Sequence, residues 1–305
     1  MNTVELTMST LIDRTLEEIQ APSEVSKTVA MPAALAAGVT STTLTGSAER
    51  TDVIEFGSEL VLVTDKSADA DPIYTLQRGY YYTTAATIAS GAVGFKNPQF
   101  PRHRVMQAVR RSFDALEAMG VPLIKSTLLT PEPSPFTDDN QMILDPGESV
   151  REVLDVRSML YSQPNWEFID HVPTTELSSG NLIRLRWSSA DTTEYTVVYR
   201  VPYRWSDDVV TEASTIEVPE GAEFLPSAYA AAWLCMAREV SRHDLDRVAE
   251  WTEGEPTRAG VSARMVQAKW SDFYRRLDEA RRLNPIPKRR PWVRRPRARL
   301  ATSWY

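Results

Sequence analysis

The sequence predicts an α+β protein: a small helical bundle as the core, two inserted antiparallel β modules (barrel or sandwich) and an extended C-terminal arm. Three observations lead to this fold class. Apolar residues recur at helical spacing in four separate segments. The long stretches between these segments are rich in β-branched and aromatic residues and are punctuated by glycine. The last residues combine proline with arginine and cannot bury a core of their own.

Segments with helical spacing form the predicted bundle. In the first, at residues 10–20, apolar residues recur every three or four positions until Pro22 ends the pattern. The second begins after Pro101 and ends at Gly120, with arginines over the rest of its surface. A short isolated helix is marginal in water, so these helices are expected to pack on something. The bundle is assigned residues 1–27 and 98–122 for its N-terminal helices, and 222–283 for its C-terminal helices.

The two β modules are expected at residues 28–97 and 123–221. The first contains a β-rich run at 52–63 and regularly placed glycines, a pattern typical of a small barrel or sandwich. In the second, residues 181–187 and 194–201 alternate in part between apolar and polar side chains, as half-buried antiparallel strands do. The second module is therefore predicted to be a sandwich.

Charge is distributed unequally along the 305 residues. The net charge of the chain is −7. Residues 281–305 contain nine basic residues and no acidic residue, so this end carries +9. The remaining 25 basic and 41 acidic residues give positions 1–280 a charge of −16. Such polarity indicates that the C-terminal end has a function separate from that of the body.

The extended basic arm, residues 284–305, is the strongest candidate for a binding segment. Its basic residues could neutralise phosphates or bind an acidic partner. Aromatic and arginine side chains are also typical anchors of protein interfaces. Prolines reduce the entropy that an extended segment loses on docking. The predicted partner-binding residues are Lys288, Arg289, Arg290, Trp292, Arg294, Arg295, Arg297, Arg299, Trp304 and Tyr305.

The sequence contains no phosphate-binding glycine loop, no G-x-S-x-G turn and no H-E-x-x-H motif. Ser241, His243 and Asp244 lie close together in sequence, but on a helix immediate neighbours such as His243 and Asp244 do not face each other, and a catalytic triad is recognised by converging geometry. Cys235 lies among alanines, as a small buried residue does. Residues 138–141 resemble part of a calcium loop but lack its glycine and its terminal glutamate. We therefore expect no enzymatic activity, no cofactor and no bound metal.

The sequence also argues against membrane insertion and disulfide bonding. It contains no apolar run of the length that crosses a bilayer. Residues 1–18 include acidic side chains and lack the apolar region of a secretory signal. The single cysteine, Cys235, excludes an internal disulfide framework.

The order of these segments resembles the head-to-tail connector (adaptor) proteins in the neck of long-tailed bacteriophages. In that family a small helical bundle forms the core and a C-terminal arm reaches into a neighbouring ring. Two phrases, residues 78–86 (RGYYYTTAA) and 97–102 (NPQFPR), also look like virion proteins of actinobacteriophages. The matching parts are Leu11–Gln20, Arg102–Met119, Leu225–Glu250 and Thr257–Leu283, followed by Asn284–Tyr305.

The resemblance implies a structural protein of the virion that is assembled in the host cytoplasm. Its expected partners are the portal protein ring, a stopper or tail-terminator protein, and further copies of itself in a cyclic oligomer, commonly a dodecamer. Genomic DNA is expected to pass through the lumen without sequence-specific binding, which an acidic body would favour. Membrane contact is not expected.

Other functions remain open at this stage. The two β modules depart from small adaptors and leave another neck or tail structural protein as an alternative. A nucleic-acid-binding protein would use the basic arm to grip phosphates, although an acidic body repels DNA. A carbohydrate- or host-binding tail component would use Trp166, Trp187 and Trp205 to stack on sugars. An enzymatic function is the least favoured of these alternatives, because no residue pattern indicates a particular reaction.

Overall fold

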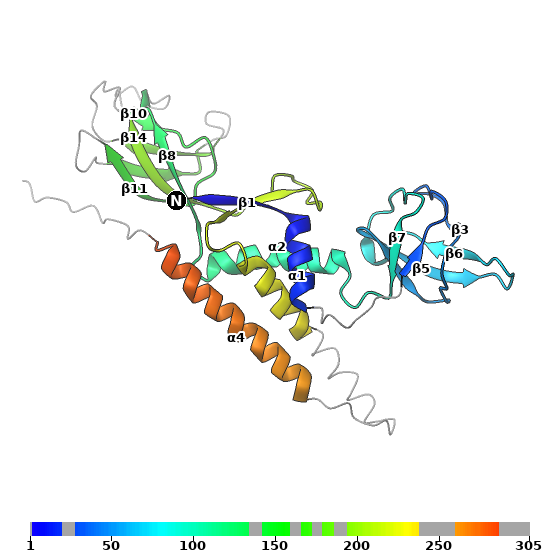
Figure 1. Cartoon of the computed structure of the whole chain (residues 1–305). Helices are drawn as coiled ribbons and strands as arrows, with labels where there is room; N and C mark the ends of the chain where they lie inside the picture. The colour runs from blue at the N-terminus through cyan, green and yellow to red at the C-terminus, as the bar shows by residue number, and fades with distance from the viewer. Residues whose placement is uncertain are drawn as a thin grey trace, which may run out of the picture. The chain divides into compact units, whose positions relative to one another are not determined.

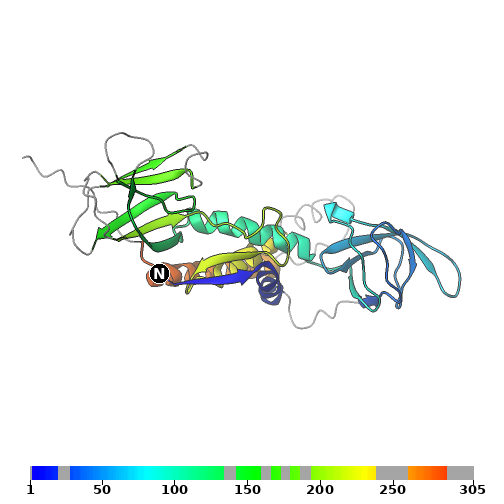
Figure 2. The same cartoon turned by 90° about the horizontal axis from the view of Figure 1, so that it is seen from above.

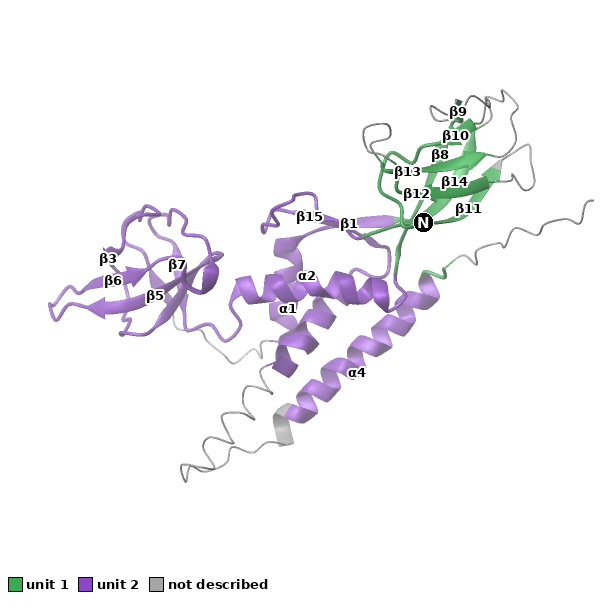
Figure 3. Cartoon of the chain, turned by 180° about the vertical axis from the view of Figure 1, so that it is seen from behind, with its two compact units in different colours: residues 1–2, 122–202, 284–305 green, residues 3–121, 203–283 purple. Residues whose placement is uncertain are grey.

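The computed structural model describes residues 2–19, 28–133, 142–158, 166–172, 179–185, 194–237 and 260–286. The chain divides into two compact units (Figure 3). One unit contains residues 1–2, 122–202 and 284–305 and consists of strands where it is described. The other contains residues 3–121 and 203–283 and holds every described helix.

The larger unit contains a core shared by helices and a two-stranded ribbon (Figure 1). Apolar side chains from the helices meet Leu6, Ile216 and Val218 of the ribbon in one cluster. Residues 225–237 are also helical, and small alanines there allow close packing. The named elements are β1 (Thr3–Thr7), α1 (Met8–Ile19), α2 (Arg102–Ala118), β15 (Thr215–Pro219) and α4 (Gly260–Leu283).

The ribbon joins the two sequence segments of this unit, residues 3–121 and 203–283. β1 and β15 pair antiparallel, with Thr7 opposite Thr215. The ribbon continues into α1, because the N–H groups of Met8 and Ser9 donate to the carbonyls of Ser214 and Glu212 (both 2.9 Å). The first helix therefore begins directly at the end of a strand.

The predicted helical-bundle core is wrong. The protein is β-rich and mixed α+β, and its described strands form four sheets of two, four, three and six strands. Residues 3–7 alternate between polar and apolar side chains, so one face of β1 can join the core while the other faces water. The ribbon thereby supplies core surface that a bundle would take from a further helix.

The sheet built from residues 28–97 is curled (Figures 1 and 2). Its strand order is β2-β7-β4-β5-β6-β3, and Ala30 and Thr45 exchange backbone hydrogen bonds that join the two edges. Gly94 is needed inside it, because a Cβ there would lie 2.6 Å from the ring of Phe56. Its elements are β2 (Thr28–Ala30), β3 (Ser41–Thr43), β4 (Val53–Phe56), β5 (Glu59–Lys66), β6 (Ile73–Gln77), η1 (Tyr80–Tyr82) and β7 (Val93–Lys96).

The smaller unit contains the other two sheets, ordered β11-β14-β8 and β12-β13-β10-β9. β14 alternates strictly between buried and half-buried residues. Tyr199 is almost fully buried there, and its hydroxyl donates to Glu148 (2.8 Å) and lies 2.9 Å from the hydroxyl of Thr127. The strands are β8 (Leu123–Leu129), β9 (Glu132–Pro133), β10 (Met142–Leu144), β11 (Glu152–Ser158), β12 (Trp166–Asp170), β13 (Asn181–Leu185) and β14 (Tyr195–Val201).

Candidate functional site

The segment predicted to bind a partner begins where α4 ends. The predicted binding residues themselves lie outside the residues that the structure describes: Lys288, Arg289, Arg290, Trp292, Arg294, Arg295, Arg297, Arg299, Trp304 and Tyr305. What the structure describes is the helix that carries them. In α4, Phe273, Leu277 and Ala280 are buried in the shared core.

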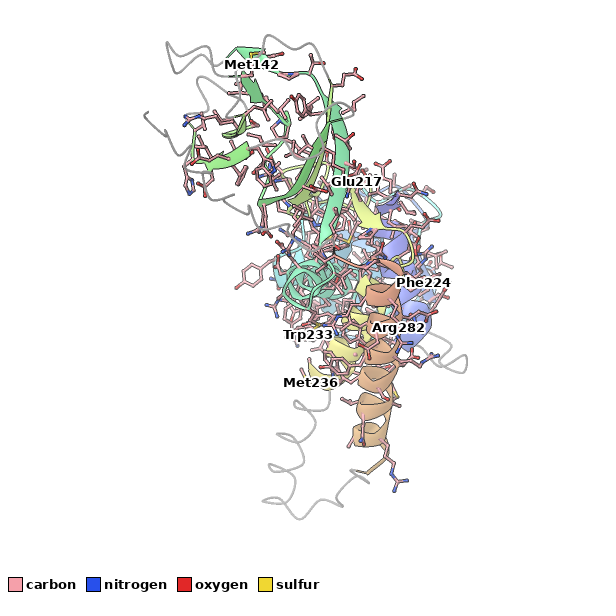
Figure 4. The ribbon with its side chains drawn as sticks, turned by 90° about the vertical axis from the view of Figure 1, so that its left-hand side faces the viewer. Met142, Glu217, Phe224, Trp233, Met236 and Arg282 are labelled. Carbon is pink, nitrogen blue, oxygen red and sulfur yellow. The ribbon has the colours of Figure 1, made fainter. Side chains whose placement is uncertain are left out.

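The last turn of α4 is fixed at two further points. The guanidinium group of Arg281 donates from both Nε (3.0 Å) and Nη2 to the carbonyl of Met119, just beyond the end of α2. Leu283 lies close to Gly221, where a Cβ would approach its Cδ1 to 2.9 Å. Arg282, between these two residues, is exposed (Figure 4). The arm therefore begins at a position held by the core of the larger unit.

A second feature is a charged junction at the start of α2. Arg102 makes a bidentate ion pair with Glu212, from Nε to Oε1 (3.1 Å) and from Nη2 to Oε2 (2.9 Å). Its Nη1 also contacts Oδ1 of Asp13 at 2.7 Å. Its backbone N–H donates to Oε1 of Glu55 in β4 (2.5 Å). One residue thus links α2 to α1, to the turn before β15 and to the curled sheet.

Glu55 is only 4% exposed. Burial raises the pKa of its carboxyl group to about 7, and the charge of Glu212 acts in the same direction, while Arg102 opposes both. A carboxyl group with such a pKa is suited to proton transfer near neutral pH. Because a substrate cannot reach this buried group, we interpret it as part of the junction and not as a catalytic residue.

A third feature is a buried ion pair inside the curled sheet. Arg78 meets Glu59 through Nε (2.7 Å) and Nη2 (2.8 Å), and both side chains are almost fully buried. Glu59 also accepts the N–H groups of Gly79 (3.1 Å) and Ala86 (3.0 Å). Burial alone would raise the pKa of Glu59, but Arg78 and the two N–H groups outweigh it and lower the pKa. The pair is therefore ionised at neutral pH.

This ion pair holds the tyrosine loop, residues 79–86. Tyr81 and Tyr82 in this loop have positive φ angles of 53° and 65°, which cost bulky residues about 1–3 kcal/mol each. Tyr82 is fully exposed, and the rings of Tyr80 and Tyr81 meet edge to face at 4.5 Å. The loop thus presents aromatic side chains to solvent on a constrained backbone, an arrangement typical of binding loops.

A hollow of about 510 Å³ lies in the smaller unit, beside β11, β12 and β14. Charged groups of both signs line it, and Arg200 pairs with Glu152 at 3.3 Å. The other lining residues are Arg151, Val153, Phe168 and Asp170. Because two arginines and two acidic residues line it, the hollow favours neither an anion nor a cation.

The remaining sequence candidates are Cys235, residues 138–141 and residues 241–244. Cys235 is buried in the shared core. Residues 138–141 and 241–244 lie outside the described part of the chain. Across the described residues, no group of three or more histidine, cysteine, aspartate or glutamate side chains is arranged to hold a metal ion. In the same residues, no helix combines the length and apolar character needed to cross a membrane.

The tryptophans considered for sugar stacking have different positions. Trp205 is half-buried and packs edge to face on Phe113 at 5.4 Å, so it belongs to the core of the larger unit. Trp166 is half-buried in β12, and Trp187 lies outside the described residues. Trp233, labelled in Figure 4, lies on the helix at 225–237. The guanidinium group of Arg111 lies over its ring, 5.0 Å from the ring centroid. Trp205 and Trp233 therefore fill structural positions.

Sequence reasoning did not single out Glu55, Glu59 or Arg78, and it treated Arg102 only as part of a helix surface. A signal was present, because both glutamates interrupt an apolar, strand-forming run at 53–63. A carboxylate in such a run predicts a buried partner. Comparison of the chain with protein-family models, with curated proteins and with solved structures finds no match.

Proposed function

We propose that this chain is a structural assembly protein that docks on its partner through residues 284–305. The observation that carries the proposal is the fixed end of α4, followed directly in sequence by a basic, proline-spaced segment with terminal aromatics. A binding segment that starts from a fixed point searches a smaller volume than one on a loose linker, which raises its effective concentration at the partner.

More narrowly, we propose a head-to-tail adaptor in the neck of a tailed bacteriophage. The sequence resemblance supports this assignment. In this proposal the arm docks on the portal ring, copies of the chain form a ring that also meets a stopper or tail-terminator protein, and DNA passes through the lumen. The acidic body, with a charge of −16 over residues 1–280, disfavours adhesion of DNA to the ring.

The experiment is a measurement of mass by light scattering, for the full chain and for a 1–283 truncation, each alone and with the candidate portal ring. We expect only the full chain to join the ring. A variant with Arg289, Arg290, Arg294 and Arg295 replaced by Gln should fail as the truncation does. The matched control is Arg264→Gln, an exposed arginine on α4 outside the arm.

Each result separates this proposal from its competitors. Equal binding by the full chain and the truncation contradicts docking through the arm. Failure of the full chain to join any portal ring contradicts the adaptor assignment. Steeply salt-dependent binding of the full chain to DNA, lost on truncation, supports a nucleic-acid-binding arm instead.

A further inference from the structure

Charge is absent from two long runs of the curled sheet. Residues 28–48 and 79–95 contain no aspartate, glutamate, lysine, arginine or histidine. The segment between them, residues 49–78, contains ten charged residues, of which seven are acidic. Over the whole chain 25% of residues are charged, so the two runs are strongly depleted.

The two runs lie side by side in the folded sheet. β2, from the first run, pairs with β7, from the second. Leu35 and Ile88 exchange backbone hydrogen bonds, and the hydroxyl of Ser90 donates to the carbonyl of Pro32 (2.9 Å). The bridge between the two sheet edges places β3 next to β2. β3, β2 and β7 are therefore consecutive around the curled sheet, and we call the exposed residues of 28–48 and 79–95 the uncharged surface.

The uncharged surface has the composition of a protein interface. Depletion of charge and enrichment of aromatic side chains mark the centre of such interfaces. The exposed large side chains include Val93 and Phe95, which point to the same side of β7. Twenty-four residues of the two runs are exposed, comparable with the roughly 20–30 residues per side of a standard interface.

The tyrosine loop belongs to the uncharged surface. Glu59 accepts the N–H groups of Gly79 and Ala86 at the two ends of the loop, and Arg78 donates to the carbonyl of Ala86. The loop therefore has little conformational freedom to lose when it binds a partner. Its two strained tyrosines present aromatic rings outward, and tyrosine is enriched among the residues that dominate binding energy. An unfavourable backbone that exposes aromatic rings points to a function in recognition.

The distribution of charge indicates which molecule binds to the uncharged surface. Neither the basic arm nor DNA finds counter-charges on this surface. Two copies of the chain repel each other through acidic bodies of −16, and a surface without charge is where they can approach with the least repulsion.

We propose that the uncharged surface of the curled sheet is where a second copy of this chain binds. The inference rests on the part of the proposed function that requires copies to assemble with one another. The inference names the surface through which copies of the chain contact one another, whereas the arm is assigned to the contact with the portal.

The test is light scattering of the full chain over a range of concentrations, compared with a Val93→Glu, Tyr82→Glu double variant. We expect the wild-type mass to rise with concentration and the double variant to self-associate at least about tenfold more weakly, because each glutamate must be buried unpaired. Both positions are exposed, at 53% for Val93 and full exposure for Tyr82, so the variant should fold. Far-ultraviolet circular dichroism checks this.

The matched control is Ala70→Glu, an exposed loop position between Asp69 and Asp71 on the charged part of the same sheet. It should associate as the wild type does. A wild type that stays monomeric at the highest concentration, or a double variant that associates as the wild type does, overturns the inference. The 1–283 truncation should still self-associate through this surface while losing the portal, so failure of the arm and failure of this surface give different results.

Discussion

Glu55 and Glu59 are four residues apart in the β4–β5 hairpin, and both are buried, yet their environments have opposite effects. Glu59 meets a guanidinium group and two N–H groups, and its pKa is lowered. Glu55 meets one N–H group and the nearby charge of Glu212, and its pKa is raised to about 7. Burial alone therefore does not determine the charge of a carboxyl group; its partners do.

The largest effect should come from breaking the fully paired site. Arg78→Ala leaves Glu59 buried without its counter-ion, and removing one partner of such a pair typically costs about 3–5 kcal/mol. We expect faster amide hydrogen exchange throughout residues 28–97, measured by mass spectrometry, and most of all at Gly79 and Ala86. Unchanged exchange at these two amides would mean that the pair does not hold the tyrosine loop.

The next effect concerns Glu55 and depends on pH. Its pKa rises from 4.5 in the unfolded chain to about 7 in the folded protein, so ionisation of Glu55 lowers the free energy of unfolding. This destabilisation is absent below pH 4.5 and reaches its full size above pH 7. Glu55→Gln keeps an acceptor for the N–H of Arg102 and should stabilise the protein above pH 7, by up to about 3 kcal/mol. Guanidinium unfolding at pH 5 and pH 8 measures the difference between variant and wild type. A difference that does not grow with pH contradicts the assigned environment.

Glu59 should show the reverse dependence. Its pKa is lowered from the ordinary value of 4.5, so the ionised carboxylate stabilises the fold when the pH is above 4.5. This stabilisation is lost as the pH falls below 4.5 and through the lowered pKa. Glu59→Gln should therefore destabilise the protein at pH 7, and by less as the pH falls. The same unfolding series, extended into the acid range, compares the two glutamates directly.

A smaller effect should follow from Arg102→Ala. The substitution removes the ion pairs to Glu212 and Asp13, which we expect to cost about 1–3 kcal/mol. Because the charge of Arg102 opposes the rise in the pKa of Glu55, the substitution should also move the titration of Glu55 to higher pH. The control is Arg104→Ala, an exposed position in the same helical turn. An equal loss of stability in Arg102→Ala and Arg104→Ala would show that the ion pairs of Arg102 do not specifically stabilise the junction.

The smallest effect is expected at the exposed pair of the same hairpin. Lys66 meets Glu49 at 3.0 Å, and Glu49 is largely exposed. Solvent screens such a pair, so Lys66→Ala should leave the unfolding midpoint within error of the wild type. A large loss of stability here would show that burial is not what separates this pair from Arg78 and Glu59.

Local patterns could be predicted from the sequence because their period is visible in it. The helix expected at 102–119 is α2, Arg102–Ala118, and the strands expected at 181–187 and 194–201 are β13 and β14. The strand at 3–7 was missed because five residues are a short pattern and its partner lies about two hundred residues away. That omission left the two-stranded ribbon out of the predicted core.

The buried charges were harder to predict because their partners are remote. Glu59 pairs with a residue 19 positions later, and Glu55 with a backbone group 47 positions later. The two uncharged runs are visible in the sequence, but only the pairing of β2 with β7 brings them together. Sequence therefore identifies unusual residues, and topology decides which of them meet.

The ribbon of β1 and β15 also determines the order of events during synthesis. β1 is translated about two hundred residues before its partner, so it cannot pair until Pro219 has been made, about 10–40 seconds later at typical rates of elongation. The strands of 28–97 and of 122–202 pair only within their own segments, so neither set waits for later residues. The core that fixes the base of the arm is therefore completed after both β modules, because it needs β15 and α4.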